Sequence, residues 1–109
     1  SALFLLNLNL INFCTSGLSI TVIQPTRHIF TDPGSSIRID CSLDRYSMSS
    51  AIMYWFRQRA YKGIERVCQE YDERTKHFQC LIDGAKNNFS VEISDLAPDD
   101  RGTYYCAAS

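Results

Sequence analysis

Apolar and polar positions alternate along several short stretches of the chain, and turn-forming residues separate these stretches. In Ile37–Cys41 the apolar positions alternate with Arg38 and Asp40. Successive side chains of a strand point to opposite faces, so this alternation predicts a strand with one buried face. Further inward-facing sets are Phe78, Cys80, Ile82 and Phe89, Val91, Ile93. Short alternating strands in close succession predict an all-β sandwich.

Turn signals lie between these strands. Pro33 and Gly34 stand in the segment 32–35, where proline presets φ and glycine accepts the left-handed region. A second turn is predicted over 83–87, and a helical turn or loop over 95–100. Because the chain shows no internal repeat and has 109 residues, we expect a single domain.

The strand predicted over 52–58 is apolar on both faces. Met53 and Trp55 would point to one face of this strand, whereas Tyr54, Phe56 and Gln58 would point to the other. A strand with one solvent-facing side would be polar at every second position, so both faces are expected to be covered. We therefore expect one face to pack on the core and the face of Tyr54, Phe56 and Gln58 to contact a partner chain.

The chain starts with an apolar segment. Ala2–Cys14 is mostly apolar, and the first charged residue is Arg27. The segment is too short to span a bilayer of roughly 30 Å, but it suits the apolar part of a secretory signal followed by small residues. We predict a signal peptide over residues 1–18, truncated at the front because its basic start and initiator Met are absent. The alternative is an apolar first strand, although clear strand signals begin only at Ile20–Ile23.

Composition and charge exclude several classes of function. A net charge of −1 gives no basic field that would favour nucleic acid. His28 and His77 are the only histidines, and neither lies near a cysteine pair at metal-ligand spacing, so we expect no metal and no cofactor. The sequence also lacks a nucleophile elbow, a triad signature and a phosphate loop, which indicates a protein that is not an enzyme.

The cysteines point to an oxidising compartment. Of the five cysteines, Cys14 falls within the predicted leader, which leaves an even set in the rest of the chain. Cysteines of secreted proteins are normally paired. Four cysteines allow three connectivities, and spacing alone does not select among them.

The order of certain residues resembles a known family. Cys41, Trp55, and then Tyr104 two residues before Cys106 follow the skeleton of an immunoglobulin sandwich. The segments 53–58, 63–65, 78–83 and 100–107 narrow the resemblance to the V-type domain of an antigen receptor, most like a T-cell receptor variable segment. The resemblance covers about residues 19–109, so it implies an immunoglobulin-like V-type β-sandwich over that range. It also implies that the last strand is missing and that the chain ends at the start of the third hypervariable loop.

The resemblance also implies roles for the core residues. It pairs Cys41 with Cys106, which leaves Cys68 with Cys80 as a second bridge between the sheets; two separately buried thiols are the alternative. Trp55 would fill the core, and Tyr104 would form the tyrosine corner. In the family the aspartate matching Asp100 usually pairs with an arginine, and here His77 stands in that place, with Arg57 as a possible substitute.

Recognition and pairing residues follow from the same resemblance. Three loops, at about 44–51, about 69–76 and from 107 onward, would contact the ligand. Their candidate residues are Asp44, Arg45, Tyr46, Ser47, Glu70, Tyr71, Asp72, Glu73, Arg74, Ala107, Ala108 and Ser109. The residues that match the face toward a partner V domain are Tyr54, Phe56, Gln58, Ile64 and Tyr105. Asn88-Phe89-Ser90 is in addition an N-glycosylation sequon, with Asn88 expected to point outward.

These observations favour a binding module. The leading hypothesis is a T-cell receptor variable region that pairs with the V domain of a second receptor chain and recognises antigen or an antigen-presenting molecule. Signalling subunits would be reached through parts that this chain does not contain. Such a protein would pass through the secretory pathway to the extracellular face of the plasma membrane, with its anchor outside this sequence. The alternatives are an innate V-type receptor or co-receptor, an antibody V segment, and a homophilic adhesion domain.

Overall fold

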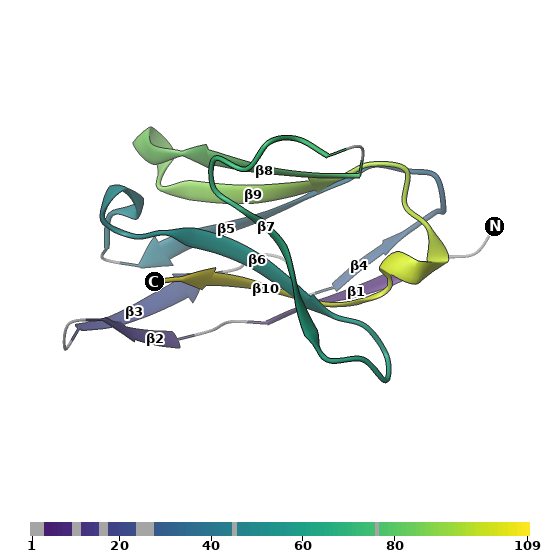
Figure 1. Cartoon of the computed structure of the whole chain (residues 1–109), viewed down its shortest axis with the longest axis horizontal. Coiled ribbons are helices and arrows are strands. Elements are labelled where there is room, and N and C mark those ends of the chain that lie inside the picture. Colours follow the sequence, from purple (N-terminus) through teal and green to yellow (C-terminus); the bar gives the residue numbers. More distant parts are fainter. Residues whose placement is uncertain (1–3, 10–11, 16–17, 24–27, 45, 76) are drawn as a thin grey trace.

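The chain folds into two packed β-sheets. In a computed structural model, the described residues are 4–9, 12–15, 18–23, 28–44, 46–75 and 77–109. The first sheet has the order β4 (His28–Thr31), β1 (Phe4–Asn9), β10 (Gly102–Ala108), β6 (Met53–Gln58), β7 (Ile64–Gln69). The second has the order β2 (Asn12–Thr15), β3 (Leu18–Ile23), β5 (Ile37–Asp44), β9 (Asn88–Ile93), β8 (Phe78–Asp83). Figure 1 shows the two layers, and the all-β sandwich expected from the sequence is confirmed.

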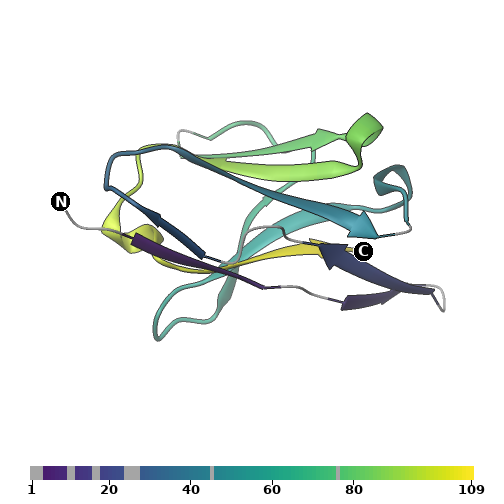
Figure 2. The same ribbon diagram turned by 180° about the vertical axis from the view of Figure 1, so that it is seen from behind.

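Among the described residues, three short 3-10 turns connect strands of this sandwich: η1 (Met48–Ser50), η2 (Gly84–Lys86) and η3 (Pro98–Asp100). η1, η2 and the C-terminus lie at one end of the molecule, and η3 lies at the other (Figures 1 and 2). The turns expected over 83–87 and 95–100 are therefore confirmed as η2 and η3. We call the end with η1 and η2 the loop end, and the end with η3 the η3 end.

The residues at the start of the chain form strands. β1 pairs in parallel with β10, from Leu6 opposite Gly102 to Asn9 opposite Tyr105, and antiparallel with β4. The clear strand signals at 20–23 are confirmed within β3. The alternative interpretation of the leader segment expected one apolar first strand, whereas the structure has two strands there, β1 and β2. Without β1, the backbone N–H and C=O groups along this edge of β10 would be unpaired. The backbone of β1 provides hydrogen-bonding partners for them.

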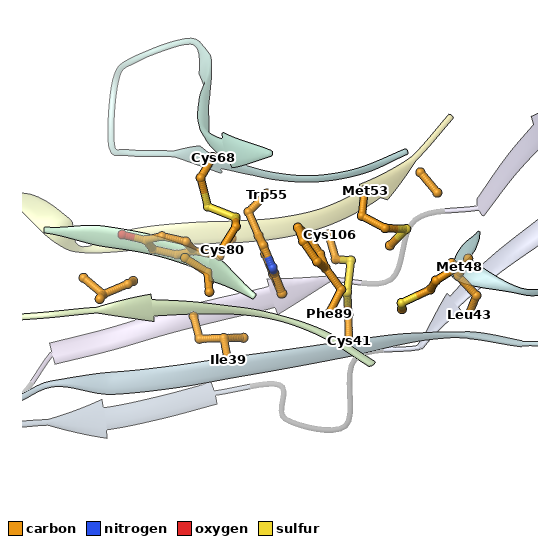
Figure 3. Packing of buried hydrophobic residues seen from close by; sticks show 14 of the residues in the cluster. Ile39, Cys41, Leu43, Met48, Met53, Trp55, Cys68, Cys80, Phe89 and Cys106 are labelled. Atoms are coloured by element: carbon orange, nitrogen blue, oxygen red, sulfur yellow. A yellow bond between two sulfur atoms is a disulfide. The ribbon is translucent and has the colours of Figure 1, made fainter. Parts of the chain in front are cut away.

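The core lies between the sheets around Trp55. Trp55 is fully buried and stacks on Phe89 of the opposite sheet, with ring centroids 6.3 Å apart. In its own sheet Trp55 is the register partner of Cys106 on one side and of Cys68 on the other. Figure 3 shows its ring between the two disulfides. The inward sets predicted from alternation all belong to this core or pack against it.

Both disulfides join one sheet to the other. Cys41 of β5 is bonded to Cys106 of β10, with Cα atoms 6.4 Å apart, and Cys68 of β7 is bonded to Cys80 of β8, with Cα atoms 5.9 Å apart. Both separations lie in the usual range for a disulfide. The first bond joins central strands, whereas the second joins an edge strand of each sheet.

Gly102 permits the close approach of β10 and β6. A Cβ atom at this position would lie 2.5 Å from the carbonyl oxygen of Gln58. Any side chain would therefore push the start of β10 away from the end of β6, where Thr103 is the register partner of Gln58. Glycine is thus required here by contact with neighbouring backbone, and it allows Tyr104 and Cys106 to reach the core.

Candidate functional site

The loop end brings together segments that are distant in the sequence. The backbone of Ser109 exchanges two hydrogen bonds with that of Ile52, at 2.9 and 3.0 Å. The Tyr54 hydroxyl lies 3.2 Å from Oγ of Ser109. The last residue of the chain is therefore held beside the residues that follow η1. The first and third predicted recognition loops meet at this point.

Asn87 holds the first loop in place. Its side-chain amide donates to the carbonyl oxygens of Leu43 and Tyr46, both at 2.9 Å, and its Oδ1 accepts from the backbone N–H of Met48 at 2.8 Å. Its φ of 52° lies in the left-handed region, which asparagine tolerates better than most residues. Sequence reasoning placed Asn87 only in a turn. The one available signal was that an asparagine at the end of a turn can adopt this conformation.

Replacing Asn87 is expected to loosen the first loop. The change to alanine removes the three hydrogen bonds of the side chain. It also places at positive φ a residue that adopts this conformation less readily than asparagine does. We expect a loss of about 2–3 kcal/mol in the free energy of unfolding. Asn87→Gly accepts the backbone conformation and loses only the hydrogen bonds, so its loss should be smaller. Hydrogen exchange should show faster exchange of the Met48 amide in both variants, and an unchanged rate there would contradict this role.

The first loop is only partly available to a ligand. Asp44 ends β5 and is exposed, and Ser47 is exposed and caps η1 by accepting from the N–H of Ser49. Tyr46 is half-buried and packs against the core. Arg45, which was also predicted to contact the ligand, lies outside the described residues.

The candidate residues of the third loop need a correction. Ala107 and Ala108 were expected to begin a loop, but both are buried and belong to β10. β10 continues because Ala107 and Ala108 pair with Tyr54 and Met53 of β6. Their side chains are therefore not available to a ligand. Only Ser109 of this group is exposed.

The second loop divides into two parts. Its start, at Gln69 to Tyr71, lies beside the first loop, where these residues line one cavity with Met48 and Ile52. Glu70 was expected on the loop surface, but only 8% of it is exposed because its carboxylate turns inward to the start of β6. Asp72, Glu73 and Arg74 are exposed.

The outer face of β10, β6 and β7 contains the predicted pairing residues in three rows. Gln58 lies between Thr103 and Ile64, Phe56 lies between Tyr105 and Arg66, and Tyr54 lies between Ala107 and Gln69. Tyr54 and Phe56 contact each other with ring centroids 5.9 Å apart. Ile64 is 63% exposed. The five pairing candidates thus form one continuous outward surface.

Arg66 interrupts the apolar character of this surface. It lies opposite Phe56, but its guanidinium turns toward the second loop, where Nη1 donates to Oδ2 of Asp72 at 3.0 Å. Both side chains are partly exposed, so the pair contributes little stability. The ion pair with Asp72 neutralises the charge of Arg66 beside the rows that contain Tyr54 and Phe56.

A buried polar network lies at the η3 end. The Asp100 carboxylate accepts from Nη1 of Arg57 at 3.0 Å and from the backbone N–H of Ala97 at 2.9 Å, and Nε2 of His77 lies 2.7 Å away. The Tyr104 hydroxyl donates to the carbonyl oxygen of Asp100 at 2.8 Å. Asp100 therefore contacts both His77 and Arg57, the two partners considered from the sequence.

Arg57 links this network to β7. Its Nε donates to Glu65 at 2.9 Å, and its guanidinium lies 5.2 Å from the centre of the Phe78 ring. Burial alone would lower the pKa of Arg57, but hydrogen bonds with Tyr104, Glu65 and Asp100 outweigh burial and raise it. Burial would likewise raise the pKa of Asp100, whereas hydrogen bonds from Ala97, His77 and Arg57 bring it below its ordinary value. Both groups are therefore held in their charged forms.

These polar contacts join η3 to β6 and β10. Burial raises the pKa of Tyr104, so its hydroxyl stays protonated and donates to Asp100. In the part of the chain that the structure describes, no group of three or more His, Cys, Asp or Glu side chains could hold a metal ion. The candidate site consists of the loop end and the outer face of β10, β6 and β7.

A comparison with protein-family models supports this interpretation. The model of the immunoglobulin V-set domain matches residues 24–109. The matched range starts just before β4 and includes η1, η2, both disulfides and every pairing candidate. The match therefore covers the strands β4 to β10 and both candidate surfaces, and it leaves out β1, β2 and β3.

Proposed function

Because the chain belongs to the immunoglobulin V-set family, we propose that it acts as a T-cell receptor variable region. V-set domains are typically extracellular binding modules that pair with other immunoglobulin domains or bind ligands. In this proposal the outer face of β10, β6 and β7 pairs with the V domain of a second receptor chain. The loop end contributes to recognition of antigen or of an antigen-presenting molecule. The domain binds its ligand and catalyses no reaction.

The observation that supports pairing is a surface on which the half-buried Phe56 and Tyr105 lie beside the exposed Ile64. Phe56, Tyr105 and Ile64 lie in adjacent rows, and Gln58 stands beside them with Nε2 donating to the carbonyl oxygen of Lys62. Aromatic residues are enriched in interfaces, and apolar side chains grouped on a surface favour association. A glutamine among them can exchange hydrogen bonds with its counterpart in a related domain.

Pairing can be tested by co-expression in a secretory host. The chain would be produced with a panel of V-set domains from the same genome, and co-purification would report a partner. We expect Ile64→Arg and Gln58→Arg to weaken binding of that partner at least tenfold, because both introduce a charge into the interface. The control is Gln79→Arg in β8, on the opposite sheet. Equal loss with the control, or binding that survives both interface changes, would overturn the proposed surface.

Two alternatives predict different results. A homophilic adhesion domain would associate with itself, which sedimentation of the chain alone would detect. An innate V-type receptor is distinguished from a variable segment by the genomic DNA that follows the codon of Ser109. A recombination signal there would support the variable segment, and an uninterrupted exon would support the innate receptor.

Export is part of the proposal. Cleavage after about residue 18 would remove β1 and β2 from the sheets and leave the edge of β10 open to another strand. Among the described residues, no helix is long and apolar enough to cross a membrane. N-terminal sequencing of secreted protein would test the cleavage, and retention of residues 1–18 in the secreted form would contradict it.

Glycosylation of Asn88 also stays a prediction. Asn88 is half-buried, with its amide donating to Asp40, and Ser90 of the sequon is fully buried. A transferase would therefore reach the sequon before the domain folds. Loss of mass on enzymatic deglycosylation of the secreted chain is the expected result.

A further inference from the structure

A cavity at the loop end lies between the first loop, the start of the second loop and η2. Its volume is about 450 Å³, which lies within the range of sites for small ligands or for single side chains of a larger ligand. Apolar side chains supply part of the wall, and the other lining residues are mainly polar: the first group is Met48, Ala51, Ile52 and Ile82, and the second is Ser49, Gln69, Glu70, Tyr71 and Gly84. The cavity thus combines apolar walls with one carboxylate.

The carboxylate of Glu70 is buried with a single hydrogen bond. Its Oε1 accepts from the backbone N–H of Met53 at 2.8 Å. Within the described part of the chain, no Lys, Arg or His side chain forms an ion pair with it. A carboxylate can accept about four hydrogen bonds, so most of this capacity is free. A cationic donor from a ligand can fill this capacity with charge-assisted hydrogen bonds.

The rim of the cavity is held by its own contacts. Tyr71 has a φ of 66°, an uncommon conformation for a residue with a large side chain. The turn that contains it is closed by the N–H of Asp72 donating to the carbonyl oxygen of Gln69, and by the N–H of Gln69 donating to Oδ2 of Asp72. Tyr71 is therefore kept exposed beside Glu70, where an aromatic ring can stack on a planar cation.

We propose that this cavity binds an arginine side chain of the protein ligand. The methylene groups of the arginine would pack on Met48 and Ile52, and its guanidinium would donate to the Glu70 carboxylate. Guanidinium is favoured over ammonium because it is more weakly hydrated and donates two parallel hydrogen bonds to a carboxylate. The inference rests on the proposed function, since it specifies the chemistry that the loop end recognises.

The test uses the full 109-residue chain labelled with ¹⁵N. The probe is Nα-acetyl-arginine methylamide, and the matched neutral probe is the citrulline analogue, which has the same shape without the charge. We expect saturable chemical-shift changes at the amides of Met53, Glu70 and Tyr71 with the arginine probe, and binding at least tenfold weaker with the citrulline probe. The lysine analogue should bind more weakly than arginine but more tightly than citrulline.

Two variants locate the binding. Glu70→Gln keeps an oxygen that can accept from Met53 but removes the charge, so binding of the arginine probe should fall at least tenfold. Glu73→Gln removes an exposed carboxylate from the same loop, the second one, and should leave binding of the arginine probe unchanged. Equal binding of the arginine and citrulline probes to the unaltered chain, or no saturable shift in the millimolar range, would overturn the proposal. The probes need no partner domain, so failure here leaves the pairing result intact, and failure of pairing leaves this result intact.

Discussion

Asp100→Ala is expected to lower the free energy of unfolding by about 3–5 kcal/mol. The side chain of Asp100 is only 5% exposed, and its carboxylate accepts from Arg57 and from the N–H of Ala97. Its loss would leave the buried Arg57 with Glu65 as its remaining ionic partner and the N–H of Ala97 without its acceptor, which is why the expected cost is large. Urea denaturation at pH 7, followed by the fluorescence of Trp55, would measure it.

Asp99 offers a matched control for this change. It is the neighbouring aspartate in η3, but its side chain is 77% exposed, and it forms an ion pair with Arg59. Surface ion pairs contribute about 0–1 kcal/mol, so Asp99→Ala should have little effect. A similar loss in the two variants would show that the cost comes from η3 itself and not from the buried charge.

The contribution of Asp100 should depend on pH in one direction. Because its folded pKa lies below the unfolded value, the stabilisation is fully present above the unfolded pKa, near 3.9, and is lost as pH falls through the folded pKa. The difference in stability between the unaltered chain and Asp100→Asn should therefore shrink as pH falls below about 4. A difference that grows toward acid would contradict a lowered pKa.

Much of the fold follows from local patterns. The alternation in 37–41, 78–82 and 89–93 identified inward side chains correctly because one face of each strand packs on a core, and period 2 then determines which residues face it. Trp55 between Cys68 and Cys106 explains why cysteine, tryptophan and cysteine recur in this order. The surface of Tyr54, Phe56 and Gln58 could also be predicted. Alternate residues of a strand point to opposite faces, so these three lie on the other face from Met53 and Trp55.

Other features depend on contacts that no local pattern contains. Asn87 bonds to Leu43, Tyr46 and Met48, which are about 40 residues away, so only the folded chain shows its role. Glu70 looks like a surface residue in a charged loop, yet its carboxylate turns inward because the first N–H of β6 needs an acceptor. Ala107 and Ala108 continue β10 because β6 offers paired positions up to Met53.

Removing the two disulfides separately is expected to destabilise the domain unequally. Cys41 and Cys106 are 65 residues apart, so their bond closes a long loop, and the chain-entropy estimate for it is about 4 kcal/mol. Cys68 and Cys80 are 12 residues apart, for which the same estimate is about 3 kcal/mol. Small domains have total stabilities of about 5–15 kcal/mol, so the central bond would contribute a large share of such a total.

The positions of the bonds enlarge the difference. Cys41 and Cys106 are completely buried in the central strands, so the change of both to alanine also removes packing around Phe89 and Trp55. Cys68 and Cys80 join the edge strands β7 and β8, where the structure can adjust more easily. We therefore expect the central double variant to lose at least about 1 kcal/mol more than the edge double variant.

Urea denaturation of both double variants would measure this difference, and mass spectrometry after thiol alkylation would verify that the remaining bond is intact in each. Hydrogen exchange adds a local test. Loss of the edge bond should increase exchange mainly in β7 and β8, whereas loss of the central bond should increase it in both sheets, since β5 and β10 each pair with neighbours on both sides. An edge variant as unstable as the central one would show that the contact between β7 and β8 contributes as much to the fold as the core around Trp55.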